Sequence, residues 1–108
     1  MPSAKPGEVW MVDLGMAAKV RPCLVLTRPP QDNELDVFTV VAHTTSRRDN
    51  RWEIPFEKSF LRDDGAFDMQ RISSVASVKL ERKLGDLTST EMQMILGRLA
   101  ERFGMKSS

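Results

Sequence analysis

Hydrophobic and polar residues alternate along most of the chain, and this period of two is typical of β-strands. In the segment Glu8–Leu14, for example, Trp10, Val12 and Leu14 fall on one face. Residues that favour turns, such as consecutive prolines and an Asp-Asn pair, interrupt the pattern. The strands predicted in this way are Glu8–Leu14, Val20–Thr27, Leu35–Thr44, a short strand within 51–56 and at least one strand within 66–78.

The period changes near the C-terminus, where the pattern predicts an amphipathic helix. Thr88 and Glu91 have the spacing of a capping box, in which each side chain accepts a backbone N–H at the helix start. Gly104 supplies a stop signal. The apolar stripe between them comprises Met92, Ile95, Leu96, Leu99 and Phe103. Strands followed by one helix predict a mainly β fold with α, either a small antiparallel barrel or a sheet covered by the helix.

Composition narrows the class of protein without deciding its function. A chain of 108 residues is expected to form one domain over 1–108. Sixteen basic and fifteen acidic residues give a net charge of +1, so only the distribution of charge can indicate a nucleic-acid partner. One cysteine and one histidine fall short of a disulfide framework or a structural zinc site, and we expect no metal and no cofactor.

Targeting signals are not recognisable in the sequence. No apolar run approaches the roughly 18 residues of a membrane span. Met1–Pro6 lacks the apolar stretch of a signal peptide. We therefore expect a cytoplasmic protein without a membrane partner.

Groups that suit a phosphate gather at two strand ends. Thr44 ends the third predicted strand, and Thr45, Ser46 and three arginines follow it. Arg21 precedes a proline at the opening of the second strand. A guanidinium matches two phosphate oxygens, and a hydroxyl can add a further hydrogen bond. Taken alone, this pattern is compatible with nucleic-acid contact and equally with a solvated basic surface.

Other candidate groups favour structural roles. Cys23 lies in mid-strand beside leucines, which is typical of a small buried hydrophobe and not of a nucleophile. Asp63, Asp64 and Asp68 occur in a turn-like stretch, where solvated carboxylates are expected in place of a catalytic pair. No G-x-S-x-G elbow and no glycine-rich phosphate loop is present.

Taken in order along the chain, these motifs resemble the MazF/PemK-type toxins of type II toxin–antitoxin systems. "KPGEVWMVDL" is similar to the family's opening strand, and "RPCLVLT" to its Arg-Pro strand. "VVAHTTS" corresponds to the strand that ends on a threonine. "GAFDMQRISSVASVKLERKLGDLTSTEMQMI" resembles the Gln-bearing strand, the short Arg/Lys helix, the next strand and the C-terminal helix.

The resemblance implies a fold, partners and an activity. It implies an SH3-like antiparallel β-barrel closed by the helix, a homodimer, and a small acidic cognate antitoxin as partner. The implied activity is metal-independent, sequence-specific cleavage of single-stranded RNA, leaving a 2′,3′-cyclic phosphate and a 5′-hydroxyl. The family's arginine falls on Arg21 and its catalytic threonine on Thr44, and Gln70 aligns with a glutamine near the RNA groove.

His43 has two competing roles. Its unperturbed pKa near neutrality suits a general base, which would make it a third catalytic residue beside Arg21 and Thr44. In a regular strand, however, His43 and Thr44 point to opposite faces. A histidine packed at a dimer contact or beneath the barrel is therefore the alternative.

The loops around the implied site depart from the family pattern. The connection "GMAAK" is short, and Lys19 stands where many relatives have an acidic residue. Trp52 either stacks on a base or packs against the fold. The residues expected to contact RNA are Lys19, Thr45, Ser46, Arg47, Arg48, Arg51 and Gln70, with an exposed basic hairpin as the alternative for the arginines.

Two other functions remain open on the sequence. A gyrase-poisoning toxin of the CcdB type would share the fold and act by binding a protein. That mode relies on an apolar C-terminal end, whereas "RFGMKSS" is polar beyond Met105. An RNA-binding module without cleavage is the second alternative.

Overall fold

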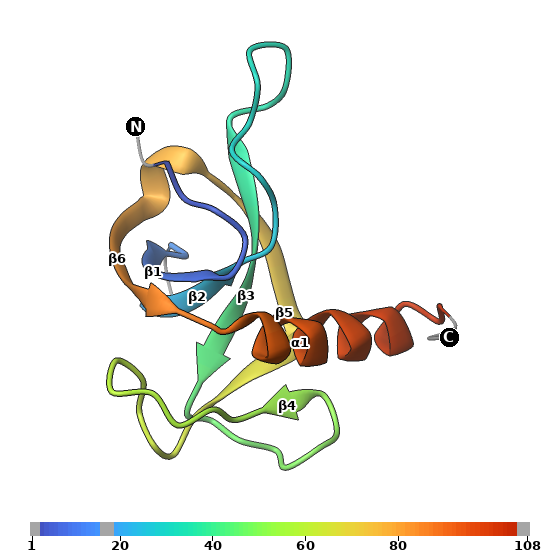
Figure 1. The fold of residues 1–108 in the computed structure, drawn as a ribbon. Coiled ribbons are helices and arrows are strands. Elements are labelled where there is room, and N and C mark those ends of the chain that lie inside the picture. Colours follow the sequence, from blue (N-terminus) through green and yellow to red (C-terminus); the bar gives the residue numbers. More distant parts are fainter. Residues whose placement is uncertain (1–2, 16–18, 106–108) are drawn as a thin grey trace.

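One antiparallel sheet of six strands forms most of the computed structural model, which describes residues 3–15 and 19–105 (Figure 1). The strand order is β4-β5-β3-β2-β1-β6, so the last strand pairs with the first. A short 3₁₀ helix, Ser77–Lys79, joins β5 to β6. The strands are β1 (Glu8–Asp13), β2 (Val20–Val25), β3 (Val37–Thr44), β4 (Glu53–Ile54), β5 (Ala66–Ala76) and β6 (Leu80–Asp86).

All five strands predicted from the alternating pattern are present, with shorter boundaries. The predicted strand within 51–56 is reduced to the two residues of β4, because Pro55 cannot donate to a ladder. The third strand begins at Val37 in place of Leu35, since Leu35 belongs to the turn-rich connection and is 81% exposed. The expected face of the first strand is confirmed: Val12 is buried, and Trp10 and Leu14 pack against the same core.

Closure of the sheet into a barrel, which the family resemblance implied, is not found. Within the described residues β4 pairs only with β5 and β6 only with β1, so these two strands remain edges. β4 has only two residues, which is too short for an extended ladder with a second strand. The apolar face that closure would shield is covered by Leu61 from the β4–β5 connection and by Ile95 and Leu99 from the helix. The fold is therefore a strongly curved open sheet covered by a helix.

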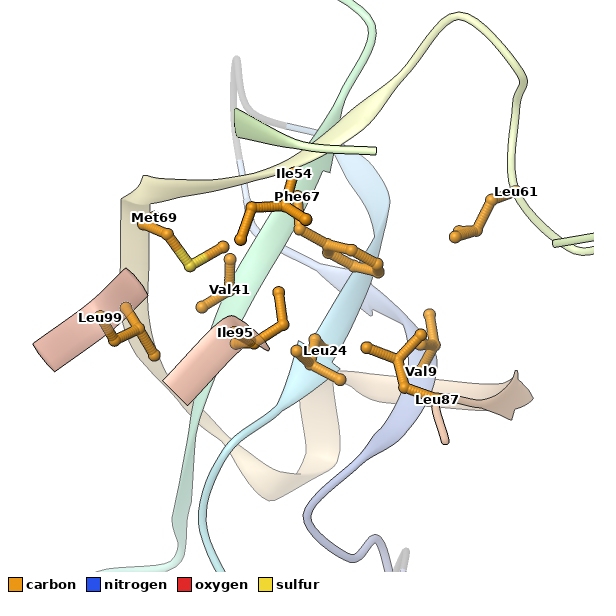
Figure 2. Packing of buried hydrophobic residues seen from close by; sticks show 10 residues of the cluster. All are labelled: Val9, Leu24, Val41, Ile54, Leu61, Phe67, Met69, Leu87, Ile95 and Leu99. Atoms are coloured by element: carbon orange, nitrogen blue, oxygen red, sulfur yellow. The ribbon is translucent and has the colours of Figure 1, made fainter. Parts of the chain in front are cut away.

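The sheet has a separate hydrophobic core on each face. The larger core includes Phe67 and Met69 of β5 and the two buried helix residues, and Figure 2 shows their side chains within one cluster with Val41. The other core forms around Phe38. The larger core consists of Val9, Leu24, Val41, Ile54, Leu61, Phe67, Met69, Leu87, Ile95 and Leu99. The second consists of Ala4, Val12, Cys23, Val25, Phe38, Val40, Ala42 and Leu80.

The C-terminal helix α1 (Ser89–Arg102) lies across the larger core (Figure 1). The capping box is confirmed: the Thr88 hydroxyl accepts the Glu91 N–H at 3.1 Å, and the Glu91 carboxylate accepts the Thr88 N–H at 2.8 Å. The buried stripe of α1 is narrower than predicted, because Leu96 and Phe103 are 50% and 63% exposed. Over residues 3–15 and 19–105, no helix combines the length and apolar character needed to cross a membrane.

Candidate active site

Arg21, near the start of β2, lies at a pocket between β2, β3 and β5. Side chains alternate along β2, so Arg21 shares its face with Cys23 and Val25 of the second core. Arg21 itself is half-buried. The pocket has a volume of about 550 Å³. It is lined by Leu14, Arg21, Ala42, Arg71, Ile72, Ser73, Ser74 and Val75.

Thr44 is the last residue of β3 and lies two residues beyond the end of the ladder with β2. β2 and β3 pair Cys23 with Ala42. The ladder ends there, and alternation places Arg21 and Thr44, each two residues further on, on the same face as that pair. Thr44 is not among the residues that line the pocket. Thr44 is only 1% exposed, and its Oγ1 accepts the Ser46 N–H at 3.0 Å. Since a hydroxyl carries one proton and accepts through lone pairs, the Thr44 O–H can still donate.

Arg71 and two serines belong to the same pocket, and the sequence analysis did not select them. The register of β5 against β3 shifts between Phe67 and Ile72, and Figure 2 shows the strand turning a corner beside Met69. The corner brings Arg71, Ser73 and Ser74 to the pocket that Arg21 lines. An arginine followed by two hydroxyls was a signal of the same kind as the one at Thr44. Its position could not be found, because a period-two pattern does not reveal a register shift.

His43 lies on the opposite face from Thr44, within the larger core. It is 4% exposed, and its ring meets Phe67 edge-on with centroids 5.1 Å apart. Gly65 lies directly against the ring: a Cβ there would be 2.2 Å from His43 Cε1. Within the described chain, Nε2 has no hydrogen-bond partner. This geometry supports the packed-histidine alternative, because the imidazole does not face Arg21 or Thr44.

Burial also shifts the pKa values of His43 and Cys23. It lowers the pKa of His43, an effect that the nearby Asp64 carboxylate partly opposes. It raises the pKa of the Cys23 thiol to about 12. Cys23 therefore stays protonated near neutral pH and is not a nucleophile. In the part of the chain that the structure describes, no three His, Cys, Asp or Glu side chains gather as a metal site would require.

The basic loop after Thr44 is organised around Glu53, whose side chain is fully buried. Its Oε1 accepts the Arg47 Nε–H and the Asp49 N–H, both at 2.9 Å. Its Oε2 accepts the Arg48 N–H at 2.9 Å. The Arg48 backbone N–H is the main cause that holds the pKa of Glu53 below its ordinary value, with Arg47 acting in the same direction. Arg47 is thus engaged inside the protein, whereas Arg48 is exposed.

Arg51 and Trp52 pack toward helix α1. Arg51 forms an ion pair with Glu101, and its backbone carbonyl accepts a hydrogen bond from Arg98. The guanidinium groups of Arg51 and Arg102 both stack over the Trp52 ring, at 4.7 and 5.3 Å from its centroid. Trp52 also packs against the larger core. Of the two alternatives for Trp52, the structure supports packing.

The remaining residues expected to contact RNA are scattered. Thr45 and Ser46 are exposed beside the end of β3. Gln70 is exposed, and its Oε1 accepts a hydrogen bond from Asn50 Nδ2 at 2.9 Å. Lys19 is exposed and has a positive φ of 60°. Residues 16–18 of the shortened loop before it lie outside the described part of the chain.

The three aspartates between 63 and 68 differ in burial. Asp63 and Asp64 are exposed as expected, and Asp64 pairs with Arg62. Asp68 is not solvated: it is 4% exposed and accepts the Gln70 N–H at 2.9 Å. Its carboxylate also lies 3.4 Å from Arg71 Nε. The expectation of a solvated carboxylate is therefore wrong for Asp68, because it belongs to the corner of β5.

Comparison with known proteins gives one family and a consistent fold. Residues 5–103 match the model of a family described as the PemK-like, MazF-like toxin of type II toxin-antitoxin systems. A search of curated proteins found no match.

Several solved structures share the fold. An endoribonuclease from Mycobacterial species is 23% identical with a TM-score of 0.79, covering 100% of this chain and 98% of that chain. A mycobacterial endoribonuclease in complex with its cognate antitoxin is 24% identical with a TM-score of 0.79, covering 97% and 99%. MazE-MazF from Deinococcus radiodurans is 14% identical with a TM-score of 0.79, covering 98% and 100%. At these identities, the likeness establishes the shared fold.

Proposed function

Because this chain belongs to the PemK-like, MazF-like toxins of type II toxin–antitoxin systems, we propose that it is a metal-independent endoribonuclease that cuts single-stranded RNA at a short sequence. The solved neighbours described as endoribonucleases support this proposal. The observation that supports it for this chain is the pocket lined by Arg21 and Arg71, beside the end of the β2–β3 ladder beyond which Thr44 lies.

The proposed chemistry needs no nucleophile from the protein. The ribose 2′-oxygen attacks the adjacent phosphorus, and the bond from phosphorus to the 5′-oxygen breaks. The products are a 2′,3′-cyclic phosphate and a 5′-hydroxyl. The protein's task is to stabilise the added negative charge on the five-coordinate phosphorus, where each preorganised donor contributes about 3–4 kcal/mol.

Arg21 and Thr44 are the proposed donors at that phosphorus. A guanidinium donates two parallel hydrogen bonds to phosphate oxygens, and it stays charged throughout the physiological pH range. The Thr44 O–H supplies a further bond. Thr44 is only 1% exposed, so little of its side chain reaches the surface before RNA binds. His43 is left out of this proposal, since it faces the opposite side of the sheet.

The test is incubation of the purified protein with a mixed-sequence RNA in EDTA. Cleavage with cyclic-phosphate ends, and resistance of the matching DNA, would support the proposal, because DNA lacks the attacking hydroxyl. Loss of cleavage in Thr44→Ala, with the melting temperature retained, would support the site. Intact RNA that the protein retains would point to a binding module, and intact RNA without binding would point to a CcdB-like toxin.

Family membership also brings two proposed partners, a second copy of this chain and a small acidic antitoxin. The neighbours described as complexes with an antitoxin support the second. Light scattering on the purified protein measures the first, with twice the monomer mass as the expected result.

A further inference from the structure

The carboxylate of Glu53 determines the shape of the loop that follows Thr44. It lies on the two-residue strand β4, whose pairing with β5 places Glu53 opposite Asp68. From there it accepts three hydrogen bonds from three consecutive residues, Arg47, Arg48 and Asp49. Asp49 has a φ of 56°, a left-handed conformation that a non-glycine residue adopts only where its surroundings compensate. The buried charge of Glu53 supplies that compensation.

This arrangement separates two neighbouring arginines. The Arg47 side chain is 27% exposed and is engaged by Glu53 and, at 3.6 Å, by Asp49. Arg48 is held through its backbone N–H, which leaves its side chain at the surface. Among the described residues its guanidinium has no ion pair. Arg48 is therefore the cation of this turn that a phosphate can reach at no cost to the fold.

We propose that Glu53 is a positioning residue for RNA, which holds the turn 47–49 so that Arg48 contacts a phosphate flanking the one bound at Arg21 and Thr44. The inference rests on the proposed function, because it takes RNA as the ligand. It concerns binding only, so it is tested separately from cleavage. No contact between Glu53 and RNA is involved, and the whole effect passes through Arg48.

The sign of the effect distinguishes positioning from simple electrostatics. Glu53→Gln removes a negative charge, and screened attraction alone would then bind RNA slightly more tightly. The amide also brings an N–H₂ group against backbone N–H donors, which breaks the turn. The proposal therefore expects weaker RNA binding. Glu57→Gln is the matched control, since Glu57 is exposed on the connection after β4 and loses the same charge.

The experiment is a double-mutant cycle on RNA affinity. Fluorescence anisotropy measures the Kd of a single-stranded RNA with 2′-O-methyl groups, which cannot supply the nucleophile, for wild type, Glu53→Gln, Arg48→Ala and the double variant. We expect Glu53→Gln to raise the Kd about tenfold. Arg48→Ala should lower the salt slope by about 0.7, as for one lost phosphate contact on a single strand. In the Arg48→Ala background, Glu53→Gln should have no further effect.

Two results would overturn the proposal. One is an unchanged or lower Kd for Glu53→Gln, matching the Glu57→Gln control. The other is the same weakening with and without Arg48, which would assign Glu53 a general structural role. If Glu53→Gln does not melt cooperatively, Arg47→Ala takes its place in the cycle. It removes one of the three donors to Glu53, and its smaller effect on the Kd must likewise vanish without Arg48.

Discussion

The Arg21 pocket and the turn 47–49 use the same side chain in opposite ways. In the pocket, Arg21 and Arg71 border a space of about 550 Å³ together with two serines. In the turn, the Arg47 guanidinium forms an ion pair with the buried carboxylate of Glu53. Three arginines close together in sequence are thus less informative than two arginines that the sheet brings together from separate strands.

The difference arises from what each region must satisfy. Glu53 is buried and charged, and a buried carboxylate needs donors, so the loop supplies an arginine and two backbone N–H groups to it. In the pocket, Arg71 also lies beside a buried carboxylate, since Asp68 is 4% exposed and its Oδ2 is 3.4 Å from Arg71 Nε. The Arg71 side chain is nevertheless 40% exposed, so it remains accessible at the pocket, whereas the Arg47 side chain is 27% exposed.

The largest effect is expected from removing the Arg21 guanidinium, which lines the pocket. Arg21→Ala should lower kcat for RNA cleavage by about 10²–10³-fold, since one donor to the transition state is lost. The rate of cleavage is measured under single-turnover conditions, with an RNA that the wild-type protein cleaves. Arg28→Ala, an exposed arginine in the connection after β2, is the control with the same change of charge. A kcat within threefold of wild type would refute the site.

A smaller effect is expected from removing Arg71, the second arginine that lines this pocket. Arg71→Ala should lower kcat/KM about tenfold, the value of one charge-assisted hydrogen bond. Arg82→Ala provides the comparison, because Arg82 is exposed on β6 and lines no part of this pocket. Equal effects of the two variants would mean that general charge, and not the corner of β5, draws the RNA.

Substitutions in the turn 47–49 should change the free energy of unfolding more than they change catalysis. Arg47→Ala should lower the free energy of unfolding by about 1 kcal/mol, because a partly exposed arginine bonded to a buried carboxylate is removed. Arg48→Ala should change it by less than about 0.5 kcal/mol, as for an ordinary surface substitution. Urea denaturation of the two variants checks this order. A reversed order would contradict the division of roles.

The smallest effect at neutral pH is expected at His43. Its folded pKa is lowered, so the unfolded chain binds more protons, and stability falls as the pH drops below about 6.5. His43→Leu removes this contribution, together with an unpaired buried nitrogen worth about 1 kcal/mol. Melting temperatures between pH 7 and pH 5 should therefore decline less in the variant. Parallel declines would show that His43 does not titrate on unfolding.

Local patterns were sufficient for the elements of the fold. Alternation predicted five of the six strands, and the Thr88–Glu91 pair predicted the helix start, because both signals depend on residues close in sequence. Only the family resemblance indicated β6. The same alternation placed His43 and Thr44 on opposite faces. Alternation could not predict that β4 and β6 remain open edges of the sheet. The length of β4 depends on Pro55 and on the residues that pack against the strand.

The candidate site was predictable only where a strand end marked it. Arg21 and Thr44 stand at such ends, and the family resemblance connected them. Arg71 stands in mid-strand, and only the register shift of β5 brings it to the pocket. The engagement of Arg47 was hidden as well, because nothing in the order of residues shows that Glu53 is buried and needs a donor.

The close approach of Gly65 to the His43 ring has a consequence for how this sequence can change. A methyl group at 65 would occupy space that the imidazole already fills. An alanine there becomes acceptable once position 43 carries a shorter side chain, so the order in which the two substitutions arise decides whether the intermediate folds. Homologues that diverge at both positions together would record that path.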